Sequence, residues 1–300
     1  MDPPEPAFAS FAALDFSARS TPSPARPSAD ACWLGVAGRE PAYARTRGAA
    51  WDEVAAWAAG ATREGAALLG VDFALGLPAG TAGALDVGGW RGVWSLLEGL
   101  VADDAESNAN NRFEAAARLN ERIGAGAGPW WGCPPARASA WLTPRRGFAW
   151  PVVAASGAVL PRMRAADRAC PGVQEVWKLL GAGSVGSQTL LGVAGLSRLR
   201  GRLAVDGVRL RVWPFERTFA PAAGELWVAE IWPGLLEAEV RASSLGIRDA
   251  AQVAAWVRWA ERGAAGAWEV PLPEEAREEG WILRAGPTLG CADIWRSGDL

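Results

Sequence analysis

The sequence predicts an α/β domain built around a mixed β-sheet, and three observations point to this class. Residues 8–16, 31–37 and 41–47 have strand-like patterns and are close enough in the chain to be antiparallel neighbours. Residues 51–65 follow the apolar period of an amphipathic helix and stop at a glycine. The continuous apolar run 67–78, which ends in glycine and proline, has the pattern of a buried central strand.

The first of these strands ends in the stretch FAALDFS, where an apolar run leads to Asp15. A loop from Ser17 to Asp30, rich in proline, serine and arginine, follows. Because α/β sheets place their chemistry at the carboxyl ends of strands, Asp15 is the first candidate site residue. Later stretches repeat the pattern around three more acids, Asp72, Glu230 and Asp249.

The order strand, strand, strand, helix, strand is the front half of a ribonuclease H-like fold, and it predicts that Asp15 and Asp72 lie on adjacent strands. We expect one domain over residues 8–290, with a flexible tail at 1–7 and a large, mainly helical insertion at about 79–205. The other predicted elements are a helix at 111–123, loops over 136–171, a helix–loop–helix at 172–202, strands at 208–216 and 225–233, a helix at 248–263 and one short strand near the C-terminus.

The composition excludes several chemistries. The 300 residues include no histidine, so the chain can form neither a Ser-His-Asp or Cys-His mechanism nor a zinc site with histidine ligands. The formal net charge of −3 gives no global signal for nucleic acid or an anionic membrane, although it is compatible with an enzyme that has a local basic groove. Acid–base or metal chemistry must therefore use carboxylates, lysine, cysteine, tyrosine or water.

Cysteine spacing and the N-terminus favour a cytoplasmic protein without a membrane partner. The four cysteines are scattered, with no Cys-x-x-Cys pair, as expected of reduced thiols. The opening MDPPEPAFAS lacks the basic and apolar regions of a secretory signal, and no apolar run approaches the ~18 residues of a membrane span.

The acids form the first candidate constellation. Mg²⁺ or Mn²⁺ needs hard oxygen ligands, and two-metal hydrolysis of phosphodiesters requires no histidine. Asp15, Asp72 and Asp249 are the predicted metal ligands, with Glu230 and Glu216 assisting. Each acid also has a structural interpretation: Asp249 suits the N-terminal dipole of its helix and Asp15 could cap a turn. A charge at Asp72 is harder to explain structurally, because its apolar neighbours predict burial.

The second constellation is WKLLGAGSVGSQT, in which Gly181, Gly183 and Gly186 give the spacing GxGxxG shortly after the only lysine, Lys178. A dinucleotide fingerprint would need a strand before the glycines and a helix after them. We favour a tight turn whose amides, together with Lys178, bind phosphate or another anion, and close packing is the alternative. The same turn supplies two further candidate ligands, Ser184 and Gln188.

The third constellation is SNANNRFEAAARLN, which contains all four asparagines of the chain. Asn111 and Arg112 are candidates for binding a polar ligand, as is Asn120. The alternative is structural, since asparagine is a preferred N-cap residue at the start of a helix.

Several motifs together resemble one family. GVDFALGLP around Asp72, EIWP at Glu230 and DAAQVAAW at Asp249 resemble motifs of the DUF429 family, predicted nucleases of the ribonuclease H-like superfamily. The resemblance covers about residues 8–285 and is closest to a bacterial subgroup whose members sometimes carry names from molybdopterin guanine dinucleotide synthesis. The further subgroup motifs appear here as LDFSARS, Asn108–Asn120, Trp131–Pro134, Trp177–Gln188 and Trp213–Glu216. One departure is Ala74, where the family often has proline.

The resemblance implies a ribonuclease H-like core with Asp15, Asp72, Glu230 and Asp249 as acidic site residues. The leading functional hypothesis is metal-dependent phosphodiester hydrolysis, with nucleic acid or a nucleotide as substrate and Mg²⁺ or Mn²⁺ as cofactor. The first alternative is a nucleotide-binding or cofactor-biosynthesis enzyme related to molybdopterin dinucleotide. The second is a non-catalytic binding module that keeps the fold.

Overall fold

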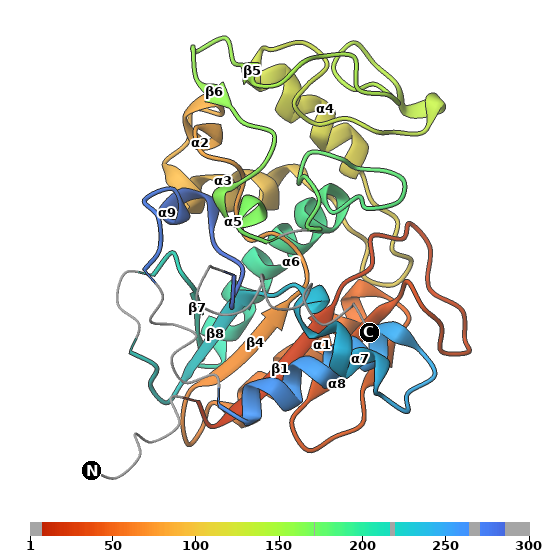
Figure 1. The fold of residues 1–300 in the computed structure, drawn as a ribbon, viewed down its shortest axis with the longest axis vertical. Coiled ribbons are helices and arrows are strands. Elements are labelled where there is room, and N and C mark those ends of the chain that lie inside the picture. Colours follow the sequence, from red (N-terminus) through yellow and green to blue (C-terminus); the bar gives the residue numbers. More distant parts are fainter. Residues whose placement is uncertain (1–7, 171, 217–219, 264–270, 286–300) are drawn as a thin grey trace, which may run out of the picture.

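The centre of the fold is a mixed six-stranded sheet in the order β3-β2-β1-β4-β8-β7 (Figure 1). β1 is antiparallel to β2 and parallel to β4, β2 is antiparallel to β3, and β8 is parallel to both β4 and β7. The strands are β1 (Ser10–Asp15), β2 (Cys32–Val36), β3 (Ala42–Ala44), β4 (Ala67–Val71), β7 (Arg209–Val212) and β8 (Glu225–Glu230). A separate hairpin pairs β5 (Val152–Val153) with β6 (Val159–Leu160).

Helices cover both faces of this sheet. The helices are α1 (Arg47–Ala61), α2 (Thr81–Ala84), α3 (Gly89–Leu100), α4 (Arg112–Ile123), α5 (Ala165–Arg168), α6 (Gly186–Val205), α7 (Glu237–Arg241), α8 (Arg248–Glu261) and α9 (Ala276–Glu279), with short 3₁₀ turns at Pro135–Arg137 and Pro233–Leu236. None in the described part of the chain is long and apolar enough to cross a membrane.

The structure is a computed structural model that describes residues 8–170, 172–216, 220–263 and 271–285. The predicted tail at 1–7, the end of the predicted domain at 286–290 and Cys291 lie outside the described residues.

Side chains alternate between the two faces of the sheet along each strand, so the core has two layers, one on each face. Leu14, Val71 and Val228 belong to a cluster shared with α1, α3 and α6. Ala13 and Ala229 belong to a second cluster shared with α8. Because side chains alternate between the faces of a strand, two residues separated by two positions share a face.

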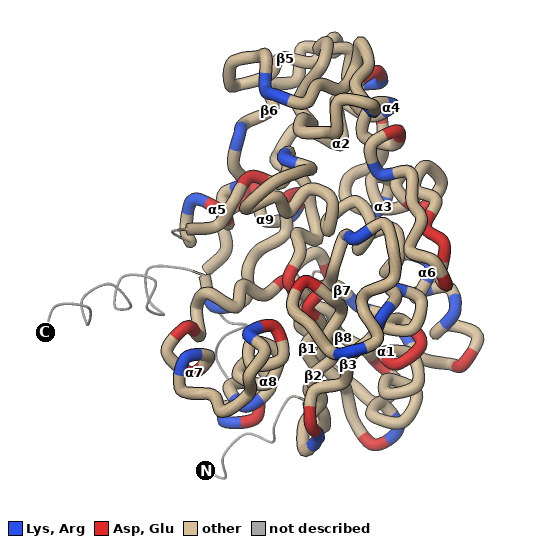
Figure 2. The backbone as a smooth tube through the Cα atoms, turned by 90° about the vertical axis from the view of Figure 1, so that its right-hand side faces the viewer, with Lys and Arg blue, Asp and Glu red and all other residues tan. Residues whose placement is uncertain are grey.

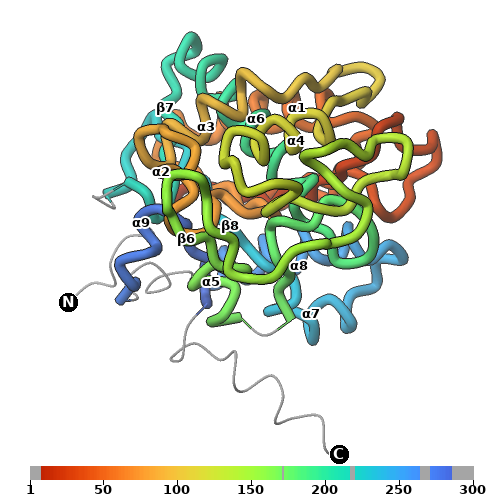
Figure 3. The backbone as a smooth tube through the Cα atoms, turned by 90° about the horizontal axis from the view of Figure 1, so that it is seen from above, coloured from red at the N-terminus to blue at the C-terminus, as the bar shows by residue number. Residues whose placement is uncertain are grey.

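The segment between β4 and α6 occupies the upper part of the molecule in Figure 1, and its loops lie over the rest of the chain in Figure 3. The predicted helix–loop–helix at 172–202 is wrong in its first half: residues 172–185 form turns and loops, and only α6 is helical. In the described residues of the predicted loops over 136–171, only short elements occur, the β5–β6 hairpin and α5 among them. In place of the predicted short C-terminal strand, the described residues show an isolated bridge between Glu230 and Ile282.

Gly192 allows α6 to pack against the residue that follows Asp72. A Cβ at Gly192 would lie 2.5 Å from the ring of Phe73, whereas a Cβ at Gly201 of the same helix would meet nothing within 4 Å. We therefore expect Gly192→Ala to lower the free energy of unfolding by about 1–2 kcal/mol through overpacking. Gly201→Ala should raise it by up to about 1 kcal/mol, because alanine has the higher helix propensity. Urea denaturation measures both, and equal effects of the two variants would contradict this packing.

Candidate functional site

Asp15 and Asp72 lie side by side where two parallel strands end. The register pairs Leu14 with Val71, so the next residue on each strand is an aspartate. The ladder extends one step further, because the Asp72 amide donates to the carbonyl of Leu14 at 3.3 Å. The Asp72 carboxylate then accepts the amide of Phe16 at 2.9 Å, which ties the loop after β1 to the loop after β4.

The two carboxyl groups are hydrogen-bonded to each other, and both have raised pKa values. Burial raises the pKa of Asp15 well above its usual range, and the negative charges of Asp72 and Asp249 raise it further. Burial also raises the pKa of Asp72 to about 7, although hydrogen bonds from the Phe16 amide and from Asp15 oppose the rise. Both residues nevertheless keep part of their surface exposed. This is the pattern of two like charges in one site, where a proton or a cation is needed between them.

Asp249 lies close enough to the pair for its negative charge to raise the pKa of both aspartates. It lies in the first turn of α8, the helix that packs on β1 and β2. One carboxylate oxygen accepts the amide of Asp30 at 2.7 Å. Burial raises the pKa of Asp249, while this hydrogen bond lowers it. Asp249 therefore contributes negative charge to Asp15 and also fixes the end of the loop after β1.

The three aspartates do not form a preassembled metal cage. Within the described ranges, no group of three or more Asp, Glu, Cys or His side chains is placed to hold a metal ion. The predicted three-ligand set is thus only partly assembled: Asp15 and Asp72 are in contact, and Asp249 is bound to a backbone amide instead. The hard carboxylate oxygens of the pair are suited to Mg²⁺ or Mn²⁺.

Glu230 does not join the aspartates. It follows Val228 by two positions, so the alternation of β8 directs it to the face away from α8. Both of its oxygens are bound by the buried Arg164, at 2.5 and 2.7 Å, and Arg164 also pairs with Asp167. Glu230 accepts the Leu75 amide as well, which fixes the loop after β4. Its contacts are those of a structural ion pair.

Two other predicted ligands also lie elsewhere. Glu216 pairs with Arg91 and Arg211 beyond the end of β7. Asn111 uses both ends of its amide on backbone groups, accepting from the Ala102 amide and donating to the carbonyl of Leu100. The structure thus favours the structural interpretation of Asn111, which joins the start of α4 to the end of α3.

Arg47 is a site-supporting residue that the sequence analysis did not identify. Its side chain is 1% exposed and forms an ion pair with Asp103 at 2.5 Å. It also donates to the carbonyls of Ser17 and Arg19, at 3.2 and 2.6 Å, and so holds the loop that follows Asp15. Asn108 continues the network, because its side chain accepts the Arg47 amide. The burial of a single arginine at a helix start has no local sequence signal.

The Gly-rich turn lies beside the acids. A groove of about 420 Å³, here called the arginine groove, is lined by Ala18, Arg19, Asp30, Arg112 and residues of the turn from Leu179 to Gln188. Gln188 donates to the carbonyl of Phe16 at 2.7 Å, directly after Asp15. Asp30 lines the groove and also binds Asp249. The three predicted constellations therefore meet at one place.

The turn itself has no dinucleotide-binding geometry. No strand precedes its glycines in the described chain, where Lys178 makes only an isolated bridge to Trp131. Gly186 is required for packing, because a Cβ there would lie 2.4 Å from the carbonyl oxygen of Val176. Lys178 does not line the arginine groove; its ammonium group donates to the Ala182 carbonyl at 2.5 Å and supports the turn.

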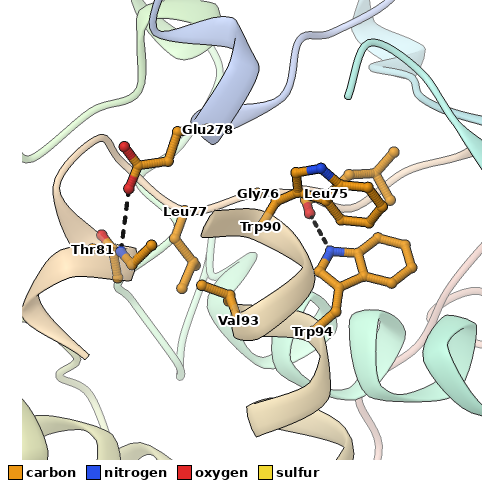
Figure 4. A pocket seen from close by; sticks show the side chains of 9 residues that line it. Leu75, Gly76, Leu77, Thr81, Trp90, Val93, Trp94 and Glu278 are labelled. Atoms are coloured by element: carbon orange, nitrogen blue, oxygen red, sulfur yellow. Dashed lines mark hydrogen bonds between the residues drawn. The ribbon is translucent and has the colours of Figure 1, made fainter. Parts of the chain in front are cut away.

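Two other hollows are poor candidates for the chemistry. The apolar pocket in Figure 4 lies between the loop after β4, α3 and Glu278, and its volume of about 10 Å³ has room for about one water molecule. A hollow of about 790 Å³ near α9 is lined by Glu274, Glu275, Glu278 and Arg277, an acidic surface that would repel anions.

Comparison of the chain with protein-family models, with curated proteins and with solved structures gave no match. The site is therefore interpreted from its own geometry.

The raised pKa of Asp72 predicts how the stability of the metal-free protein depends on pH. Since its folded-state pKa of about 7 exceeds the ordinary value of 3.8, the folded state holds the proton more strongly, and ionisation destabilises it as pH rises through this window. We expect Asp72→Asn to gain several degrees in melting temperature relative to wild type between about pH 4 and about pH 8, in the presence of a chelator. A constant difference between the two proteins would contradict the shift.

The ion pair between Glu230 and Arg164 predicts that a substitution of Glu230 lowers the stability of the protein and leaves metal binding unchanged. Glu230→Gln leaves Arg164 buried with a weaker partner, so we expect the free energy of unfolding to fall by about 3 kcal/mol. Mg²⁺ affinity, measured by calorimetry on the folded variant, should match that of wild type. Loss of Mg²⁺ binding at unchanged stability would instead place Glu230 in the metal site.

Proposed function

We propose that the chain is a metal-dependent hydrolase of phosphate ester bonds with a ribonuclease H-like core. The observation that carries this proposal is the hydrogen-bonded pair Asp15–Asp72 at the ends of adjacent parallel strands, next to a groove lined by arginines. Acids are needed to hold a hard cation, and arginines suit a phosphate.

The topology supports the proposed core. Three antiparallel strands, the crossover helix α1 and a fourth strand beside β1 occur in the expected order. β8 extends the sheet on the far side of β4 and runs parallel to it. The acids lie at the carboxyl ends of central strands, where α/β sheets bind ligands.

The donor set is compatible with Mg²⁺ or Mn²⁺. Mg²⁺ is usually held by one or two carboxylates, with waters and substrate phosphates completing its shell, so the pair suffices without a third acid. When bound, the ion would supply Lewis-acid activation of the phosphate and of the attacking water. Asp15 and Asp72 would hold it as carboxylates, after losing the proton they share.

The remaining residues of the site would bind the substrate or hold the loops beside the acid pair in position. Asp249 and the amide of Asp30 fix the loop after β1, and Gln188 fixes the residue next to Asp15. The guanidinium of Arg112 would hold a substrate oxygen and offset its negative charge. Arg47 acts through the loop and is a positioning residue.

One observation favours the alternative of a non-catalytic module, namely that Asp249 does not complete a three-acid group with the pair in the described structure. A nucleotide-binding or cofactor-biosynthesis enzyme would use the same groove without hydrolysis. The proposed hydrolase cleaves a phosphate ester, whereas neither alternative does, so cleavage distinguishes them.

The proposal predicts cleavage that depends on the acid pair. We expect wild-type protein with Mg²⁺ or Mn²⁺ to hydrolyse at least one substrate in a panel of bis(p-nitrophenyl) phosphate, nucleotides, DNA, RNA and RNA–DNA hybrid. Asp15→Asn should reduce the rate at least about 100-fold, because it weakens the hold on the cation. Asp206→Asn, an exposed aspartate at the end of α6, is the matched control and should keep full activity.

Equal cleavage by wild type and Asp15→Asn would show that a contaminant or another site is responsible. No cleavage of any substrate by wild-type protein that binds Mg²⁺ would favour the non-catalytic module.

A further inference from the structure

We propose that the substrate is a small phosphorylated molecule of nucleotide size, and that the arginine groove binds its phosphate. This inference deepens the proposed function and rests on it for the assignment of the ligand as a substrate. The binding itself can be tested without any catalysis.

The groove has the size of a small-molecule site. Its volume of about 420 Å³ lies in the range of about 300–1,000 Å³ found for such sites. Its walls come from the loop after β1, from the start of α4 and from the Gly-rich turn, so residues far apart in the chain enclose it.

Arg112 is a buried cation at this groove with donor capacity to spare. The residue is 8% exposed, and burial lowers the pKa of its guanidinium to about 10. Nε donates to Ser187, and Nη1 donates to Ser20 and Asn110, which together fix the side chain. Nη2 has no acceptor among the described residues. A buried guanidinium held in place with a free N–H edge is suited to an anionic oxygen.

Arg19 supplies a second, independent indication. Its Nε is buried and has no hydrogen-bond partner among the described residues. Its nearest carboxylate is Asp30, at 3.7 Å from Nη1, which is longer than a hydrogen bond. Unpaired buried donors are costly in a folded protein, so a ligand that accepts from Arg19 would remove this cost.

The start of α6 adds donors on the third wall. Ser187 and Gln188 lie in the first turn of this 20-residue helix, where backbone amides have no partner within the helix. In the described chain these two amides also find no acceptor elsewhere. Gly181 and Gly183 have positive φ angles of 93° and 69°, which fold the turn back over the helix start. The helix dipole favours negative charge here.

The charges favour one compact anion over a polymer. A polynucleotide needs a stripe of basic residues that follows successive phosphates. The groove offers two arginines with one aspartate, and Figure 2 shows blue and red segments interspersed along the drawn backbone. The acid pair lies next to the groove through Gln188 and Asp30, so a bound phosphate ester would lie near the proposed cation.

The decisive variant is Ser184→Asp. Ser184 lines the groove just before α6, so a carboxylate there would occupy the anion position while favouring the helix dipole and folding. Ser156→Asp, in the exposed turn between β5 and β6, is the matched control. Arg112→Gln serves as a second variant, with its melting temperature recorded because the side chain is buried.

Binding is measured by calorimetry with a chelator present, so that no metal contributes. The probes are inorganic phosphate, the four nucleoside 5′-monophosphates, the uncharged nucleosides and a single-stranded oligonucleotide without a terminal phosphate. We expect a monophosphate to bind at least about 10-fold more tightly than its nucleoside, a difference of about 1.4 kcal/mol. Ser184→Asp should remove this advantage, and Ser156→Asp should keep it.

Two results would overturn the inference. One is that neither phosphate nor any monophosphate binds, or that binding is equal in Ser184→Asp. The other is that the oligonucleotide binds more tightly than the monophosphates and loses affinity in Ser184→Asp. Its affinity would also fall steeply with salt, with a slope of log K against log salt concentration of about −0.7 per phosphate neutralised. Because the binding experiment contains no metal, a failure to bind phosphate does not contradict the hydrolase proposal. Conversely, if phosphate binds but no substrate is hydrolysed, the phosphate site is still demonstrated.

Discussion

The parallel pairing of β1 with β4 is the constraint on which the site depends. In-register pairing up to Leu14 and Val71 brings two aspartates from distant parts of the sequence to one position. Burial raises the free energy of ionising both carboxyl groups, and the negative charge of Asp72 raises that of Asp15 further. The protein tolerates this because the surrounding core is large and because the loops after both strands are fixed by hydrogen bonds such as that from Phe16 to Asp72. The ionised acid pair is thus locally destabilising, and a bound cation would offset its negative charge.

Periodicity predicted the strands and helices of the sheet well, because those elements bury continuous or alternating apolar faces that are visible locally. The same reasoning grouped Glu230 with the aspartates, since its strand also ends in an acid. It failed there because the side of the sheet to which an acid points depends on register: Glu230 shares the face of Val228 and meets Arg164. Residues 172–185 were expected to form the first half of a helix–loop–helix, yet contacts with distant residues, such as the bond from the Leu179 amide to the Trp131 carbonyl, hold them as turns and loops.

The three candidate constellations were separate in the sequence and are joined in the structure. No local pattern could show that the Gly-rich turn would reach the residue after Asp15, because that contact arises only when α6 packs across the sheet. The asparagine-rich segment proved to be largely a support: Asn108 binds Arg47, and Asn111 joins α3 to α4. Arg112, which directly follows Asn111 in that segment, is the member that reaches the groove.

The sheet order has a consequence for how the chain is made. β4 is central, yet its second neighbour, β8, begins only at Glu225, long after Val71 leaves the ribosome. Until then one edge of β4 is unpaired and the face later covered by α8 is bare, which makes the nascent chain prone to association through that edge. The strands that carry Asp15 and Asp72 are synthesised long before α8, so a ribosome stalled before Arg248 would carry both aspartates without Asp249.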